Sequence, residues 1–421
     1  MEIVSTLGAI TALAVAIGLI LKKVSPTYGM MAGALIGGLV GGADLVQTVG
    51  LMMDGAKNII PAVLRILAAG VLAGVLIESG GAARIADTIV AKLGEVRALL
   101  ALAVATMILT SVGVFIDVAV ITVAPVALLI AERAGISRFA VLLAMIGGGK
   151  AGNVMSPNPN TIAAADSFHQ SLTSVMMAGV VPGLVGLTIA YLLARRLKLF
   201  GSKVSASEVH DKNHSLALPS FASALVAPAV AIGLLALRPI AGINIDPLIA
   251  LPAGGIAGAL AMGKIAKINH YSSAGLQRML PVAVMLLGTG TLAGIIASSE
   301  LKNLLIHAIG GLGLPAYVLA PVAGILMSMA TASTTAGTAV ASQVFAATLT
   351  TLGVAPLGSA AMIHSGATVL DTLPHGSFFH ATAGAVGMNM KERLQLIPYE
   401  AAIGLGITLT ATLLYGVLKL A

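Results

Sequence analysis

Long apolar runs recur from one end of the chain to the other, beginning with Val4 to Leu21. About 20 apolar residues in a helix cross the hydrocarbon core of a bilayer. Of the 421 residues, 58% are hydrophobic and 9% are charged, which leaves too few polar side chains to cover a water-soluble fold. We therefore predict an all-α integral membrane protein in a lipid bilayer. The first run is interpreted as a retained helix, because Lys22 and Lys23 follow its apolar core instead of preceding it.

The composition also excludes several classes of function. The chain has no cysteine, so disulfides, thiolate metal sites and cysteine nucleophiles do not apply. The net charge is +7, but the basic residues are scattered between apolar runs and do not gather on one soluble face, so no nucleic-acid partner is expected. No ordered set of metal ligands stands out, and we expect neither a metal nor a cofactor.

Polar breaks divide the apolar sequence into predicted spans. Two stretches, 98 to 132 and 314 to 350, have polar residues at their centres and suit re-entrant helical hairpins. Short amphipathic pieces at 83 to 93 and 301 to 309 are expected to lie along the membrane interface. The ten predicted full spans are 3 to 21, 27 to 43, 59 to 79, 138 to 166, 172 to 194, 218 to 237, 247 to 263, 280 to 298, 357 to 385 and 395 to 418.

Basic residues predict the orientation of these spans. When the loops are assigned alternately to the two sides, 17 of the 23 basic residues fall on one side, Arg278 among them. By the positive-inside rule that side is cytoplasmic, and both termini are extracytoplasmic. Two complete crossings in place of each hairpin would give the same parity, so the bias does not distinguish these alternatives.

The two halves of the chain resemble each other weakly. A polar linker at 197–217 separates 1–196 from 218–421, and an offset of 217 aligns short motifs such as Ala144-Met145-Ile146 with Ala361-Met362-Ile363. Five crossings per half would make the two repeats inverted, as in many secondary transporters. By function, we expect a scaffold formed by 3–79 and 218–298 and a transport unit formed by 98–166 and 314–385.

Two segments interrupt predicted spans at membrane depth. The segment 147–161 combines glycines, prolines and asparagines, and the segment 364–377 breaks at the same register of the repeat. Irregular backbone inside a membrane must be buried or line a wet cavity, and the free N–H groups of broken helices suit an anionic ligand. We therefore predict substrate contacts from Lys150, Asn153, Ser156, Asn158, Asn160, Thr161, Thr368 and His375.

Polar residues also mark the centres of the two hairpins, and we expect both tips to converge on the breaks. Small hydroxyl side chains suit the hydroxyl groups of a sugar acid. The alternative is that they bond the carbonyl groups of their own helices. The predicted contacts from the second tip are Ser333, Thr334, Thr335 and Thr338.

Three charged residues, Asp117, Lys150 and Asp371, are predicted to lie deepest in the membrane. A charge at that depth is usually paired or functional. Either these groups handle substrate and protons, or Lys150 forms an ion pair with one aspartate that only closes the fold. Histidines near the second break titrate near physiological pH, which suits a proton-coupled step. The predicted proton-coupling residues are Asp117, Asp371, His364 and His380.

The segments 149–164 and 364–380 resemble signature sequences of the gluconate permease (GntP) family, and the resemblance extends over essentially the whole chain. It implies a bacterial inner-membrane proton symporter for gluconate and related hydroxy or amino acids, and not an enzyme. The family belongs to a broader superfamily of ion transporters. That superfamily implies inverted repeats with two hairpins, a homodimeric scaffold and an elevator-like moving unit.

The motifs leave the substrate open between gluconate, D-serine, glycerate and 3-hydroxybutyrate. A passive anion channel is the alternative from a different class, and it would need a continuous pore. A membrane-embedded hydrolase is disfavoured, because no pair of nucleophile and base stands out.

Overall fold

A computed structural model describes residues 4–93, 97–204, 218–301, 314–374 and 376–420. Within these ranges the regular secondary structure is helical. In the first half the helices are α1 (Thr6–Leu21), α2 (Pro26–Val40), α3 (Leu45–Asn58), α4 (Ile60–Glu78), α5 (Gly81–Leu93), α6 (Ala98–Ser111), α7 (Ile116–Ala134), α8 (Arg138–Asn153), α9 (Pro159–Ser167), α10 (Leu172–Ala178) and α11 (Val180–Arg196).

The second half is built of helices as well. It contains α13 (Phe221–Ala241), α14 (Pro247–Ala261), η3 (Ile265–Lys267), α15 (Ile268–Ala297), η4 (Ala316–Val318), α17 (Leu319–Thr331), α18 (Thr334–Thr351), α19 (Pro356–Gly366), α20 (Ser377–Ala385), α21 (Met390–Ala411) and a π-helical end η5 (Thr412–Val417).

Among the described residues, five helical segments are long and apolar enough to cross a membrane by themselves. They are Ile60–Glu78, Leu172–Arg196, Phe221–Arg238, Ile265–Ala297 and Met390–Val417. Every predicted span falls on one helix or on a pair of helices. The interfacial piece predicted at 301 to 309 lies, after Leu301, outside the described residues.

The sequence analysis missed one helix and misjudged the start of another. Helix α3 was not predicted, although Asp44 and Gln47 form a capping box at its start. Its sequence is too polar for a membrane span, which is why a search for apolar runs passes over it. Helix α15 begins at Ile268 and not near residue 280, so Arg278, counted above as a loop residue, lies inside a long helix.

Both predicted breaks are present as interruptions of the helices. Helix α8 ends at Asn153 and α9 begins at Pro159, where proline at the first helical position needs no N–H partner. The side chain of Asn158 caps α9 by accepting a hydrogen bond of 3.0 Å from the backbone N–H of Thr161. In the second half, α19 ends at Gly366 and α20 begins at Ser377.

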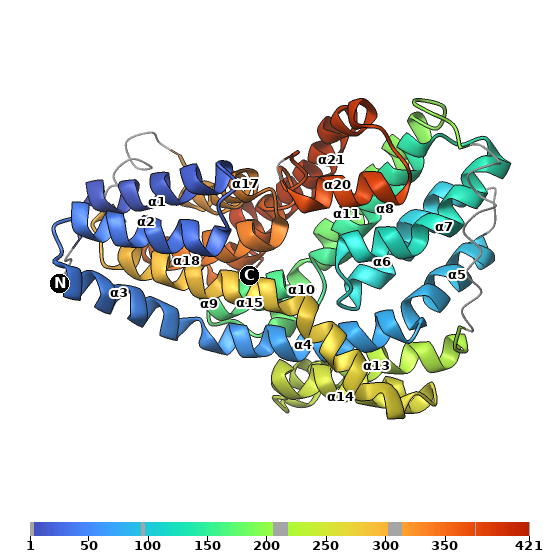
Figure 1. Cartoon of the computed structure of the whole chain (residues 1–421), viewed down its shortest axis with the longest axis horizontal. Helices are drawn as coiled ribbons and strands as arrows, with labels where there is room; N and C mark the ends of the chain where they lie inside the picture. Colours follow the sequence, from blue (N-terminus) through green and yellow to red (C-terminus); the bar gives the residue numbers. More distant parts are fainter. Residues whose placement is uncertain (1–3, 94–96, 205–217, 302–313, 375, 421) are drawn as a thin grey trace.

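Helices α4 and α15 run side by side through the middle of the molecule (Figure 1). A β-carbon at Gly275 of α15 would overlap the carbonyl oxygen of Gly70 of α4, so the two backbones touch. Helices α1 and α2 pack on each other beside one end of this pair, and α13 and α14 pack together beside the other (Figure 1). All six helices lie within 3–79 and 218–298, the ranges predicted to form the scaffold.

The offset of 217 relates the helix bounds of the two halves. Shifted by this number, α7 would occupy 333–351, and α18 spans Thr334–Thr351. Shifted α9 would occupy 376–384, and α20 spans Ser377–Ala385. This register supports an internal repeat, which stays a prediction.

Candidate functional site

A cavity of about 730 Å³ lies where the two hairpin tips, the two breaks and helix α15 meet. From the hairpins and breaks it is lined by Phe115, Ile116, Asp117, Val118, Asn153, Asn160, Ala332, Ser333, Thr334, Thr335, Asp371, Ser377 and Phe378. The opposite wall is made by Ser25, Pro26, Thr27 and residues 278, 280–282, 284 and 285 of α15. The expected convergence of the tips on the breaks is therefore observed.

Four helices begin at this cavity. The first turns of α7, α9, α18 and α20 supply Asp117, Asn160, Thr334 and Ser377 to its wall. The first turn of a helix has N–H groups without helical partners and carries a partial positive charge. Four such ends around one space favour a negatively charged ligand.

Two buried amide groups in the cavity wall are not fully bonded. In the part of the chain that the structure describes, the Nδ2 of Asn153 and the Oδ1 of Asn160 have no hydrogen-bond partner. Their side chains belong to residues that are 4% and 3% exposed. Buried amides that lack a partner are costly, so a donor and an acceptor are left for a ligand that carries both kinds of group.

Asn158, in contrast, is used by the protein itself. Its Nδ2 donates to the backbone oxygen and to the Oδ1 of Asn153, at 2.8 and 2.6 Å, and its Oδ1 accepts from the backbone and side chain of Thr161. Asn158 and Thr161 therefore hold the shape of the first break, and neither lines the cavity.

Lys150 and Asp371 join the two breaks. The Nζ of Lys150 lies 2.6 Å from the Oδ1 of Asp371 and donates to the backbone oxygen of Thr368 at 2.6 Å. Thr334, at the second hairpin tip, donates to the other carboxylate oxygen of Asp371 at 2.5 Å. Lys150 is fully buried and does not line the cavity, whereas Asp371 does. The ion pair considered from the sequence is present.

The remaining predicted residues divide between the cavity wall and the buried interior. Ser333 caps α18 and Thr335 follows in its first turn, and both line the cavity. Ser156, Thr338 and His364 are buried outside its lining, and in the described chain Ser156 Oγ, Thr338 Oγ1 and His364 Nε2 have no partner. The Thr368 hydroxyl, just after α19, donates to the backbone oxygen of Ser365 in the last turn of that helix.

Two further histidines were predicted to take part. His380 lies 2.8 Å from the backbone oxygen of Pro374 and lines a separate, smaller cavity near Thr331. His375 lies outside the described residues. The roles assigned to the histidines stay predictions.

Sequence reasoning missed three charged residues, one that lines the cavity and two that form a buried ion pair. Arg278 lines the cavity from α15. No sequence motif marks this residue, and it could have been placed at the cavity only if the start of α15 had been predicted correctly. Arg393 and Glu400 form a fully buried ion pair of 2.6 Å inside α21. Their spacing of seven residues places them on one face of a helix, which was the available signal.

Comparison with known proteins decides the family. Residues 1–418 match the family described as GntP family permease. The chain belongs to the GntP permease family. An uncharacterised transporter of Haemophilus influenzae is 65% identical over the full length of both chains. The high-affinity gluconate transporter of Escherichia coli is 26% identical over 215 residues, which cover 49% of this chain and 47% of that protein.

One solved structure shows the same fold. The crystal structure of the YdaH transporter of Alcanivorax borkumensis superposes with a TM-score of 0.61 at 16% identity, over 88% of this chain and 87% of that one. The GntP permease is thus a multi-pass membrane transporter and not an enzyme.

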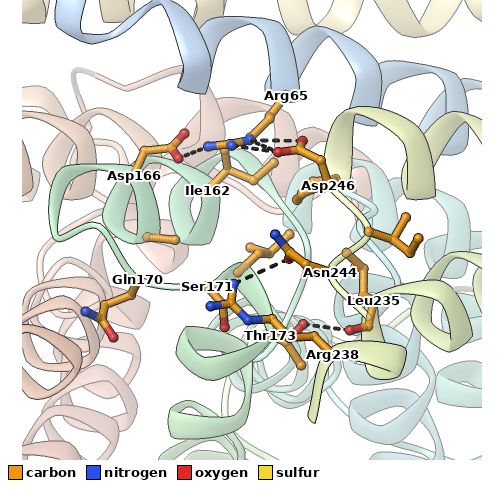
Figure 2. Close-up of a pocket in the computed structure, with 14 residues that line it drawn as sticks. Arg65, Ile162, Asp166, Gln170, Ser171, Thr173, Leu235, Arg238, Asn244 and Asp246 are labelled. Atoms are coloured by element: carbon orange, nitrogen blue, oxygen red, sulfur yellow. Dashed lines mark hydrogen bonds and ion pairs between the residues drawn. The ribbon is translucent and has the colours of Figure 1, made fainter. Parts of the chain in front are cut away.

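A second polar cluster of the GntP permease surrounds Arg65, which lies near the start of α4, and Figure 2 shows Asp166 and Asp246 on either side of it. Arg65 of α4 donates to Asp246, just before α14, through Nε at 3.1 Å and Nη2 at 2.7 Å. Its Nη1 contacts Asp166 of α9. Hydrogen bonds from Arg65 lower the pKa of the Asp246 carboxyl below its ordinary value. Arg65 therefore joins a scaffold helix to the first broken helix.

Proposed function

We propose that this GntP permease imports gluconate or a related small hydroxycarboxylate by proton symport, with elevator-like alternating access. The observation that carries the proposal is the cavity lined by both hairpin tips and both breaks. The bacterial inner membrane is the proposed location. The proposed assembly is a homodimer, as the family resemblance implies.

An anionic, hydroxylated substrate fits the chemistry of the cavity wall. Four helix N-termini favour a carboxylate. The unpaired amide groups of Asn153 and Asn160 and the hydroxyl groups of Ser333 and Thr335 are matched to a ligand rich in hydroxyl groups. Similarity to gluconate transporters of Escherichia coli and Pseudomonas aeruginosa points to the same class of substrate.

Asp117 and Asp371 are the proposed proton carriers, because both carboxylates reach the cavity. Asp371 also contacts Lys150 and Thr334, so a proton on Asp371 would weaken the link between the second hairpin tip and the first break. Coupling of protons to substrate requires that protonation of a group such as Asp371 changes how the second hairpin tip and the first break are held together.

The sides of the membrane follow from the distribution of basic residues. Ser25, Thr27 and Arg278 line the cavity and lie close in sequence to loops with the basic excess, so the cavity is proposed to open to the cytoplasm. Arg65, Asp166 and Asp246 are proposed to lie toward the other side, where their ion pairs would join the moving and fixed units. The described conformation is accordingly proposed to be open to the cytoplasm.

The deciding experiment measures uptake of labelled gluconate into proteoliposomes under separately imposed pH and sodium gradients. We expect uphill accumulation driven by the pH gradient alone. Accumulation that follows sodium and ignores pH would overturn the proton coupling. A passive channel would show no uphill accumulation under either gradient. Competition by D-serine, glycerate and 3-hydroxybutyrate ranks the alternative substrates.

A further inference from the structure

Arg278 stands on the wall of the cavity that faces the breaks. It lies about three turns from the start of α15, a helix of the predicted scaffold. Among the described residues that line the cavity it is the one positively charged side chain, and the negatively charged ones are Asp117 and Asp371.

The guanidinium group of Arg278 is only partly used. Its Nη2 lies 3.1 Å from the Oε1 of Glu78, the last residue of α4. Within the described chain, Nε and Nη1 have no partner. The side chain is 37% exposed, so the unused donors are accessible from the cavity. A guanidinium holds a carboxylate through two parallel hydrogen bonds from one edge, either Nε with Nη2 or Nη1 with Nη2. Nη2 has a second N–H besides the one directed at Glu78, so an edge for a carboxylate is completed by that N–H together with Nε or Nη1.

Lys150, the cation predicted from the sequence to meet the substrate, is engaged elsewhere. It is 0% exposed and already bonded to Asp371 and to the backbone at Thr368. A substrate carboxylate in the cavity would reach Lys150 only after the buried ion pair opened. Arg278 needs no such rearrangement.

We propose that Arg278 is a substrate ligand on the scaffold, which binds the carboxylate in the cytoplasm-open conformation and selects anions over neutral polyols. The inference rests on the proposed function and adds a specificity-determining residue to it. Glu78 is then a competitor that occupies Arg278 when the cavity is empty.

The test compares binding of an acid and of its neutral amide to purified permease in detergent. The probes are gluconate and gluconamide, or the acid and amide of D-serine or glycerate if that acid binds more tightly. We expect Arg278→Gln to weaken gluconate binding by roughly tenfold or more, because charge-assisted hydrogen bonds are lost. Binding of gluconamide should stay within about twofold. Arg278→Lys should keep part of the preference for the acid, since it retains the charge.

Two further variants keep the test decisive. Lys267→Gln removes a positive charge just before α15, at an exposed residue outside the cavity, and should leave both affinities unchanged. Glu78→Gln removes the competitor and should tighten gluconate binding severalfold, a result that does not depend on the folding of the Arg278 variants.

The outcomes separate this inference from the proposed function. If the unaltered permease binds none of the acids, the proposed function fails and Arg278 has no substrate to select. If it binds an acid and Arg278→Gln leaves that affinity unchanged, only the role of Arg278 is overturned. An equal loss for acid and amide, together with no gain from Glu78→Gln, also overturns it, because that pattern belongs to a structural residue.

Discussion

Asn158 and Asn160 lie two residues apart at the first break, but one stabilises the fold and the other lines the cavity. From the sequence, both were equally good candidates for substrate contact. In the structure Asn158 bonds Asn153 and caps α9, whereas Asn160 lines the cavity and has a buried Oδ1 without a partner among the described residues. Residue types and spacing locate such a site, but hydrogen-bond partners from neighbouring turns decide which side chain stays free for a ligand.

This difference predicts distinct phenotypes for two similar substitutions. Asn160→Ala should weaken gluconate binding by about 1 kcal/mol, or roughly fivefold in Kd, with little change in thermal stability. Asn158→Ala should lower the melting temperature, because a cap worth about 1 kcal/mol and the bond to Asn153 are lost. Binding titrations and thermal unfolding in detergent measure both quantities. Equal effects of the two substitutions on affinity and stability would contradict the assignment.

The buried pair of Lys150 and Asp371 allows the two interpretations made from the sequence to be separated. Lys150→Met leaves a carboxylate unpaired and should destabilise the fold by about 3–5 kcal/mol. The double variant Lys150→Met/Asp371→Leu should regain most of that stability but lose pH-driven uptake, because a proposed proton carrier is absent. If the double variant accumulates gluconate under a pH gradient as the unaltered permease does, the pair serves only to close the fold.

At the scale of helices, breaks and hairpins were predictable for a simple physical reason. Single prolines lie inside α7, α14, α15 and α21, but glycine, proline and polar residues clustered within one apolar run indicate an interruption, as at 147–161 and 364–377. The start of α15 was not predictable, since polar residues such as Asn269, His270 and Ser272 ended the apolar run while the helix continued. Hydropathy reports the environment of a segment, whereas helix bounds depend on backbone hydrogen bonds.

The contacts of Arg65 give a prediction with a control inside the same cluster. Asp166 belongs to α9 of the proposed moving unit, and Asp246 belongs to the scaffold, as does Arg65. Asp166→Asn should weaken the link between the two units and shift the permease away from the cytoplasm-open conformation. Asp246→Asn removes a contact within the scaffold and should leave that equilibrium largely unchanged.

The readout is labelling of a cysteine introduced at Ser333, which lines the cavity, by a membrane-impermeant thiol reagent from the cytoplasmic side. We expect slower labelling in the Asp166→Asn background and an unchanged rate in the Asp246→Asn background. Equal rates in all three backgrounds would mean that Arg65 does not hold the described conformation.

At the scale of the whole molecule, alternating access makes a prediction about exposure. The native chain has no cysteine, so single cysteines report without interference. Ser333→Cys should label from the cytoplasmic side and be protected by gluconate, whereas Ser328→Cys, at a fully buried residue of α17, should label from neither side. Simultaneous labelling of Ser333→Cys from both sides would favour the channel.

The backbone contact between α4 and α15 has a consequence for distance. Arg65 and Glu78 belong to the same helix, α4, so the distance between them is fixed. The close backbone contact of Gly70 with Gly275 keeps α15, and with it Arg278, packed on α4 beside Glu78. Thirteen residues separate Arg65 from Glu78, which at the rise of an α-helix is about 20 Å. The proposed moving unit therefore moves past a scaffold whose two charged contacts, at Arg65 and at Glu78, stay a fixed distance apart.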